Sequence, residues 1–206
     1  MQLVVLAADE QWEELTKNTP ASTEWIRATA PFSFYNHTNA AAFFLLQQPN
    51  GIDYTQTQKP VFINSVIATA AANNLPAHVL RINGWATFLQ RPLWEIAGNI
   101  TTDAANVLSK IEKKFLPVPD SPGLIAARVI AMIINEAYFA LGDNVSTATE
   151  IDTAMKLGTN YPYGPFEWAN KIGLKNIYAL LLQLSKTDNR CTPAPVLTQE
   201  TAQQLL

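Results

Sequence analysis

The stretch from Pro117 to Gly142 reads PVPDSPGLIAARVIAMIINEAYFALG and separates two differently patterned parts of the chain. Its three prolines indicate an extended connector, because proline restricts its own backbone and that of the preceding residue. Ser121 precedes Pro122, which is typical of an N-cap followed by proline at the first helical position. Of the twenty residues from Pro122 to Leu141, fifteen are apolar, so we expect a helix buried on nearly all sides.

Before this stretch, short apolar runs alternate with helix-like segments. The runs are Leu3–Ala7, Trp25–Thr29, Ala42–Leu46, Val61–Asn64, Val79–Ile82 and Leu93–Ala97. Several are apolar throughout, which is typical of parallel strands covered on both faces. Helices are expected at Glu10–Lys17 and Thr101–Phe115. Strands that alternate with helices indicate an α/β layer structure, which we assign to residues 1–116.

After the connector, the pattern is helical. Thr147 and Glu150 form a T-x-x-E capping box, and Pro165 is placed to begin a further helix. The expected helices after the long apolar one are 147–158, 165–173, 174–186 and a short one after residue 195. We therefore predict an all-helical domain over residues 117–206 and an α/β plus all-α fold.

Composition excludes several classes of function. The 206 residues include 14 Lys and Arg against 17 Asp and Glu, and a net charge of −3 argues against a nucleic-acid partner. One cysteine and two histidines leave almost no material for a metal site, so none is expected. The longest apolar stretch contains Arg128, Asn135 and Glu136, so we expect no membrane span. No signal-peptide pattern begins the chain, and the expected compartment is the cytoplasm.

The glycines argue against a standard nucleotide cradle. None of the eight stands in a G-x-G relation to another. A dinucleotide fold needs glycine after its first strand, because the pyrophosphate must approach bare backbone at a helix N-terminus. Here the first apolar run is followed by Ala8, Asp9 and Glu10, whose carboxylates would repel a pyrophosphate. From the residues alone, we expect no bound cofactor.

A few polar residues could carry chemistry. His37 and His78 could each act as a general base, but a surface or turn histidine is the favoured interpretation. Glu95 lies in a predicted buried strand and must find a partner or shift its pKa. Pairing with Arg81 or Arg91, or a place at the wet end of the strand, is favoured over catalysis.

The long helix and the loop after it also allow two interpretations each. Arg128, Asn135 and Glu136 are expected on one helix face, as a structural polar seam or, less favoured, as the lining of a ligand cleft. Four aromatic residues cluster further on, where a packed loop or subunit interface is favoured over a stacking site. They are Tyr161, Tyr163, Phe166 and Trp168.

Several segments resemble the helical C-terminal domain of 3-hydroxyacyl-CoA dehydrogenases, which also include 3-hydroxybutyryl-CoA dehydrogenases. They are SPGLIAAR (121–128), INEA (134–137), EIDTAMKLG (150–158) and YPYGPFEW (161–168). The resemblance covers roughly residues 80–197. It implies a Rossmann-like NAD-binding domain, here truncated and degenerate, before a helical domain like the 6-phosphogluconate dehydrogenase C-terminal domain. It also implies NAD-linked oxidation of a 3-hydroxyacyl-CoA and a homodimer formed through the helical domain.

Carried over by position, the family's catalytic residues are incomplete. Its H-F-x-N-P run followed by L-V-E places Asn83 where the resemblance implies a base His, and keeps Glu95 as the orienting carboxylate. Its P-G-F-x-x-N-R run places Ala127 where an Asn would contact substrate. Arg128 and Asn135 are the remaining candidates for substrate binding, and NAD is implied by the resemblance only.

Three hypotheses follow. The first is a relative of 3-hydroxyacyl-CoA dehydrogenases that keeps the fold and the dimer, and binds acyl-CoA or a catalytic partner, but transfers hydride poorly, as a pseudoenzyme. The second is a working dehydrogenase in which His37 or His78 replaces the base. The third is a structural dimer without catalysis.

Overall fold

The computed structural model describes residues 1–29, 36–47 and 52–204. They form two compact units, Met1–Leu124 and Ile125–Leu206. The boundary that the sequence places between residues 116 and 117 falls inside the first unit. The connector is tied to the sheet there, because the Gly123 amide donates to the Val66 carbonyl at 2.8 Å. Among the described residues, no helix is long and apolar enough to cross a bilayer.

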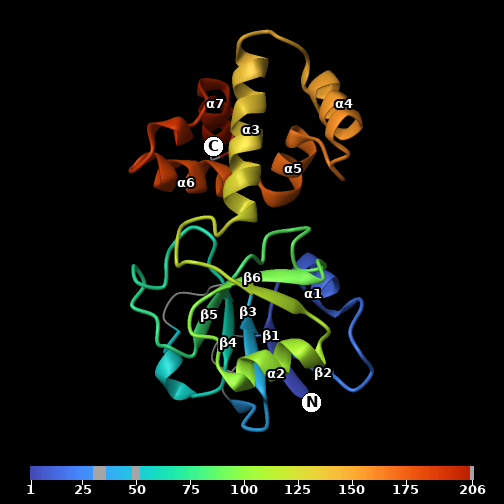
Figure 1. The fold of residues 1–206 in the computed structure, drawn as a ribbon, viewed down its shortest axis with the longest axis vertical. Helices are drawn as coiled ribbons and strands as arrows, with labels where there is room; N and C mark the ends of the chain where they lie inside the picture. The colour runs from blue at the N-terminus through green and yellow to red at the C-terminus, as the bar shows by residue number, and fades with distance from the viewer. Residues whose placement is uncertain (30–35, 48–51, 205–206) are drawn as a thin grey trace. The chain divides into compact units, whose positions relative to one another are not determined.

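The first unit is built on a seven-stranded sheet in the order β2-β1-β3-β4-β5-β6-β7 (Figure 1). Its strands are β1 (Gln2–Leu6), β2 (Glu24–Arg27), β3 (Ala42–Leu45), β4 (Val61–Asn64), β5 (Val79–Ile82), β6 (Leu93–Ala97) and β7 (Lys114–Pro117). The first five are parallel, β6 is antiparallel to β5, and β7 is parallel to β6. The predicted Rossmann-like α/β class is therefore confirmed.

Two features of the sheet differ from the expectation. The prediction of parallel order is wrong for β6, because only residues 83–92 separate it from β5, whereas a parallel return needs a crossover of about a dozen residues or more. Strand β7 is not predicted, since its residues lie at the end of and just after the helix expected over Thr101–Phe115. That helix ends early: α2 covers Thr102–Lys110, and Glu112 then takes a left-handed φ of 57°.

The two faces of the sheet are covered differently. On one face, Phe44 stacks on Phe62 with ring centroids 4.8 Å apart, and helices α1 (Asp9–Thr16) and α2 pack over this layer. On the other face, Phe43 and Ile63 are covered by connecting segments such as the 3₁₀ turn at Tyr54. A full Rossmann-like domain has helices on both faces. The shortening therefore lies in the connections, while seven strands are present.

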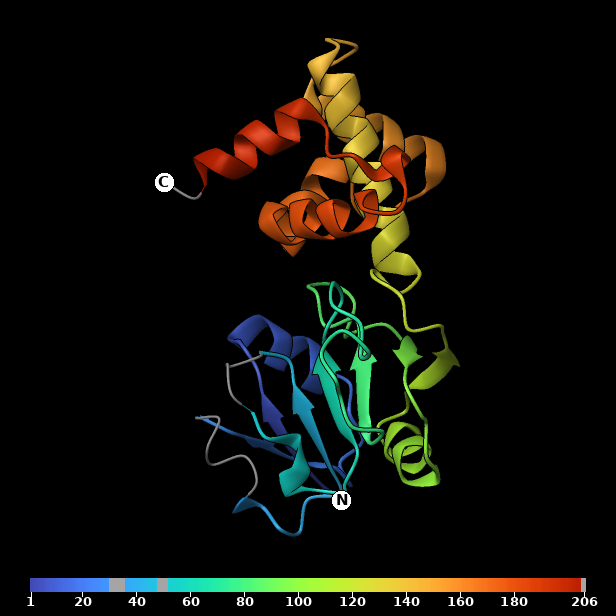
Figure 2. The same ribbon diagram turned by 90° about the vertical axis from the view of Figure 1, so that its left-hand side faces the viewer.

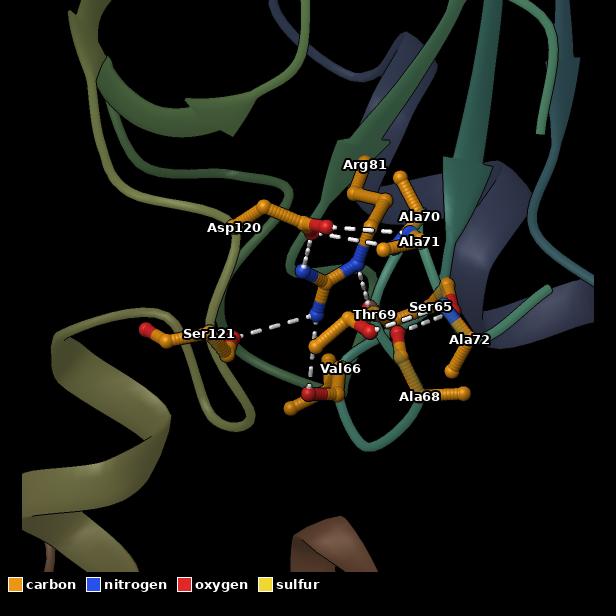
Figure 3. A network of polar contacts seen from close by, with 10 residues as sticks. All are labelled: Ser65, Val66, Ala68, Thr69, Ala70, Ala71, Ala72, Arg81, Asp120 and Ser121. Atoms are coloured by element: carbon orange, nitrogen blue, oxygen red, sulfur yellow. Dashed lines mark hydrogen bonds and ion pairs between the residues drawn. The ribbon is translucent and has the colours of Figure 1, made fainter. Parts of the chain in front are cut away.

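Arg81 of β5 is fully buried, and its guanidinium joins three segments of the first unit (Figure 3). Nε donates to the Ser65 carbonyl at 2.9 Å. The terminal nitrogens donate to the Asp120 carboxylate and, at 3.3 Å each, to the carbonyls of Val66 and Ser121. A buried cation is tolerated only when it is paired and hydrogen-bonded. Arg81 thus ties β5 to the connection after β4 and to the connector after β7.

Asp120 completes this network from the connector. Its two carboxylate oxygens accept hydrogen bonds from the amides of Ala70 and Ala71 at 3.0 and 3.1 Å (Figure 3). Burial raises the pKa of Asp120, but the two amides and the Arg81 guanidinium outweigh it, so the pKa lies below its ordinary value. The carboxylate therefore stays ionised opposite Arg81 near neutral pH.

Asp120→Asn should lower the free energy of unfolding by about 2–4 kcal/mol at pH 7, because it leaves the buried Arg81 without its counter-ion. The lowered pKa sets the sign of the pH dependence. Asp120 stabilises the native chain above about pH 4, and this contribution is lost as the pH falls through the folded-state pKa. Urea unfolding at pH 7 and in acid measures both effects. The exposed Glu13→Gln is the control, and an equal, small loss in both variants would contradict the prediction.

The second unit is helical, as predicted, and its helix α3 packs against four others (Figures 1 and 2). The helices are α3 (Ala126–Gly142), α4 (Ala148–Thr159), α5 (Pro165–Ile172), α6 (Leu174–Ser185) and α7 (Pro195–Gln203). Thr147 and Glu150 form the predicted capping box, and Pro165 begins α5. Helix α3 starts later than expected, because the Ser121 carbonyl accepts from Arg81 and Leu124 takes a φ of 51°.

Candidate functional site

The carboxyl ends of β2, β1, β3, β4 and β5 lie at one edge of the sheet, because these strands are parallel. This side is called the carboxyl edge below. Strand β1 lies between β2 and β3, so the chain leaves it toward one side and later returns on the other. In open α/β sheets, ligands bind outside the carboxyl ends of the strands at such a switch point. A site in the first unit is therefore expected at the carboxyl edge.

Asn83 and Glu95 lie near each other in this register. The antiparallel pairing of β5 and β6 joins Ile82 to Ile96, and Asn83 and Glu95 are the next residues beyond that pair on the two chain segments. The structure thus places beside one residue pair the two positions to which the resemblance assigns the base and its orienting carboxylate.

The surroundings of the two side chains differ. The Asn83 carboxamide is buried: Oδ1 accepts from the Trp85 amide at 3.1 Å, and Nδ2 has no partner among the described residues. Glu95 is half-buried, and its charge favours the protonated form of Arg91, although burial lowers the Arg91 pKa overall. Arg81, the other partner expected for Glu95, is bound in the network around Asp120. Of the two expected partners, Arg91 therefore lies within electrostatic reach.

Gln11 lies in the first turn of α1, two residues after the helix begins. Its Oε1 accepts from the Ala8 amide at 3.2 Å, and its Nε2 donates to the carbonyls of Leu46 at 3.2 Å and Gly84 at 2.9 Å. Leu46 directly follows β3, and Gly84 follows β5 by two residues. One carboxamide therefore joins the start of α1 to the ends of two strands across the switch point.

Asn64, at the end of β4, makes a second bridge of this kind. Its Nδ2 donates to the Leu46 carbonyl at 3.2 Å, and its Oδ1 accepts from the Gly84 amide at 3.0 Å. A Cβ at residue 84 would lie 2.7 Å from the Asn64 Cβ, so this close approach requires glycine. Gln11 and Asn64 together link the carboxyl ends of β1, β3, β4 and β5.

Glu14 of α1 holds the loop between β5 and β6. Its Oε1 accepts from the Thr87 amide at 2.5 Å, where Thr87 adopts a left-handed φ of 76°. Burial raises the pKa of Glu14, and the Thr87 amide opposes that shift. Sequence reasoning missed Glu14, since its partner lies 73 residues away and no local pattern marks the contact.

The two histidines lie at the opposite edge. His78 directly precedes β5, and its Nε2 lies 3.0 Å from the Tyr54 carbonyl oxygen. His37 precedes β3 and lines an open cavity of about 430 Å³ together with Lys59 and Asp103. Because β3 and β5 are parallel, both histidines are at the amino ends of their strands, whereas Asn83 and Glu95 are at the carboxyl edge.

Two of the three polar residues of α3, Arg128 and Asn135, contact loops of their own unit, whereas Glu136 is exposed. Asn135 is buried, and it donates to the Thr192 carbonyl and accepts from the Ala194 amide, both at 2.8 Å. A terminal nitrogen of Arg128 lies 3.8 Å from an Asp188 carboxylate oxygen. These contacts agree with a structural polar seam. A role of Arg128 and Asn135 in substrate binding stays a prediction.

The aromatic segment after α4 is packed within its unit. The rings of Tyr161 and Tyr163 lie 5.4 and 6.1 Å from the ring of Trp168, centroid to centroid, and Phe166 lies 4.9 Å from Tyr138 of α3. These contacts agree with the packed-loop interpretation. Among the described residues, no group of three or more His, Cys, Asp or Glu side chains could hold a metal ion.

Asp152 explains why this segment contains glycine followed by proline. Its carboxylate oxygens accept from the amides of Phe166 at 2.8 Å and Glu167 at 3.1 Å, at the start of α5. A Cβ on Gly164 would lie 2.3 Å from the Asp152 carboxyl group. Pro165 begins the helix without needing an amide partner. Asp152 of α4 therefore caps the start of α5, and the glycine and proline of the motif make room for this cap.

Gly164→Ala should destabilise the second unit by about 2–3 kcal/mol, because the added methyl group overlaps Asp152 and breaks the cap of α5. The matched control is Gly158→Ala within α4, where a Cβ meets no atom within 4 Å. Alanine is the better helix former by about 1 kcal/mol, so the control should be neutral or stabilising. Chemical unfolding followed by circular dichroism measures both, and equal stabilities of the two variants would refute this account.

Comparisons with known proteins show to which protein family this chain is related. The family model for the 3-hydroxyacyl-CoA dehydrogenase C-terminal domain matches residues 123–205. A 3-hydroxyadipyl-CoA dehydrogenase of Escherichia coli is 43% identical over 101 residues, which are 48% of this chain and 21% of that protein. The chain is related to the 3-hydroxyacyl-CoA dehydrogenases. The resemblance read from the sequence is thereby confirmed.

The relationship extends into the first unit. A 3-hydroxybutyryl-CoA dehydrogenase of Bradyrhizobium diazoefficiens is 31% identical over 143 residues, 66% of this chain and 49% of the relative. The chain thus spans no more than about half the length of these two dehydrogenases. The solved 3-hydroxybutyryl-CoA dehydrogenase PaaH1 of Ralstonia eutropha has the same fold, with a TM-score of 0.68, 22% identity, and coverage of 87% of this chain and 70% of that chain.

One expectation must be corrected. The prediction of no cofactor is wrong, because the family to which this chain is related consists of NAD-dependent dehydrogenases and therefore points to NAD. The missing glycine pattern is the reason for that expectation, but the sheet and its switch point are present. The local fit is nevertheless poor. Gln11 takes up the Ala8 amide, and Asp9 and Glu10 place negative charge at the start of α1.

Proposed function

We propose that this chain is a 3-hydroxyacyl-CoA dehydrogenase relative in fatty-acid or 3-hydroxybutyryl-CoA metabolism that binds acyl-CoA but transfers hydride poorly. The observation that carries the proposal is the placement of Asn83 and Glu95 directly beyond the Ile82–Ile96 pair at the carboxyl edge. The resemblance assigns these positions to a base and to the carboxylate that orients it. This chain keeps the carboxylate and has a carboxamide in place of the base.

A carboxamide changes what the position can do. General-base catalysis contributes about 10²–10⁴-fold to a rate, and the Asn83 amide has no basic lone pair near neutral pH. Oδ1 accepts from the Trp85 amide, and the donor of Asn83 without a partner among the described residues is the buried Nδ2–H group. Such a donor suits the carbonyl oxygen of an acyl thioester or ketone. The arrangement therefore favours binding over proton abstraction.

Two further observations support slow turnover. Ala127 stands where the resemblance implies an Asn that contacts substrate, and its methyl side chain is buried and makes no hydrogen bond. His37 and His78 lie at the amino ends of β3 and β5, away from Asn83 and Glu95. Their positions therefore do not support the alternative in which one of these histidines serves as the catalytic base.

Asn83→His should raise the rate of NADH oxidation with acetoacetyl-CoA by about 10²-fold, because it restores beside Glu95 a group that can give a proton to the ketone oxygen as hydride arrives. Absorbance at the NADH band measures the rate. Asn83→Gln, which keeps the amide, should show no gain, and adding Glu95→Gln to Asn83→His should remove most of it. Rapid turnover by the unmodified chain that Glu95→Gln abolishes would overturn the proposal, as would a histidine variant no faster than the glutamine variant.

Ligand binding and assembly complete the proposal. Acetoacetyl-CoA should raise the melting temperature, since a ligand that binds only the native state stabilises it by mass action. CoA and NADH belong in the same series, and no shift with acetoacetyl-CoA at millimolar concentration would favour a purely structural role.

We also propose a homodimer formed through the second unit. Sedimentation at micromolar concentration should show the dimer, and a monomer would refute it.

A further inference from the structure

Side chains join the carboxyl ends of the five parallel strands through hydrogen bonds. Gln11 and Asn64 link β1, β3, β4 and β5, as described above. Arg27, the last residue of β2, extends the series, because one of its terminal nitrogens donates to the Ala7 carbonyl at 3.1 Å and to Asp9 at 2.5 Å. The crevice where an open α/β sheet receives its ligand is thus crossed by hydrogen bonds internal to the chain.

Gln11 has the central place in this series. A dinucleotide fold presents free backbone amides at the start of the first helix to the pyrophosphate. Here the Ala8 amide is taken by Gln11 Oε1, and Gln11 Nε2 holds the Leu46 and Gly84 carbonyls across the switch point. The side chain is part-buried at these contacts, so it occupies space as well as hydrogen-bonding groups. A pyrophosphate and the Gln11 carboxamide therefore compete for one position.

We propose that Gln11 sets the affinity of this crevice for an adenine dinucleotide, because its carboxamide closes the crevice and must release Leu46 and Gly84 before a pyrophosphate can enter. The inference rests on the proposed function in taking NAD as the ligand class. A protein that binds only in a minor open state has an apparent affinity reduced by the population of that state. A side chain that fills this position therefore weakens dinucleotide binding, through the space it takes as well as through its bonds.

This coupling has a signature that a purely structural role would lack. Removing the carboxamide should lower the stability of the unliganded chain and raise its affinity for NAD at the same time. Removing the hydrogen bonds while refilling the space should lower stability without that gain. Gln11→Ala and Gln11→Ser open the crevice, and Gln11→Leu keeps it filled with a side chain of similar size. Gln47→Ala, an exposed glutamine close to Leu46, is the matched control.

Isothermal titration with NAD and thermal unfolding without ligand, both on the full chain, test the proposal. Gln11→Ala and Gln11→Ser should bind NAD about tenfold more tightly than the unmodified chain and melt at a lower temperature. Gln11→Leu should melt lower without tighter binding, and Gln47→Ala should match the unmodified chain. If the opening variants bind no more tightly, or if neither they nor the parent bind at millimolar NAD, Gln11 does not set the affinity.

The test separates this inference from the proposed function. Stabilisation by acetoacetyl-CoA and the rate gain of Asn83→His over Asn83→Gln are both measured with Gln11 unchanged. If those two results appear while the Gln11 variants bind NAD as the parent does, the proposal for Gln11 fails and the proposed function stands. If acetoacetyl-CoA gives no stabilisation and Asn83→His no gain, the proposed function fails, whatever the Gln11 variants show.

Discussion

The buried guanidinium of Arg81 is the interaction on which the first unit depends. A cation without solvent needs several acceptors, and Arg81 finds them in the Asp120 carboxylate and in carbonyls on both sides of β5. The connection after β4 and the connector after β7 are held by one group as a result. Their ends are fixed relative to β5, and β5 leads directly into Asn83 and Gly84 at the carboxyl edge. The pairing of one buried charge thus contributes to the geometry of the candidate site, together with the bonds of Gln11, Asn64 and Glu14.

The short connections between the strands explain why the first unit needs the buried charge of Arg81. A Rossmann-like sheet is ordinarily covered by helices on both faces, whereas in the part of this unit that the structure describes one face is covered by connecting segments. Such segments bring backbone carbonyls and amides close to the sheet, and buried backbone groups need partners. Arg81, Asn64 and Gln11 supply them with side chains. The polar side chains that hold the shortened unit together are consequently the ones that occupy the carboxyl edge.

Local patterns account for what the sequence could predict. The six predicted strands lie within two residues of the observed ones, because each is a short apolar run bounded by turn residues. Strand β7 carries Lys114 and Pro117 and has no such run, so it resembled the end of a helix. The bridges made by Gln11, Asn64 and Glu14 could not be predicted, since their long-range partners lie 18 to 73 residues away. The adjacency of Asn83 and Glu95 needed the register of β5 and β6.

Polar groups on one side of the carboxyl edge have hydrogen-bond partners, whereas two buried ones on the other side have none among the described residues. Around the switch point, Gln11 and Asn64 pair with the backbone groups they reach. In the loop after β5, Asn83 Nδ2 and Thr87 Oγ1 are buried without a partner among the described residues, a state that costs about 1–3 kcal/mol for each group. An uncompensated donor therefore lies in the loop after β5, whereas the side-chain amides around the switch point are already bonded within the chain.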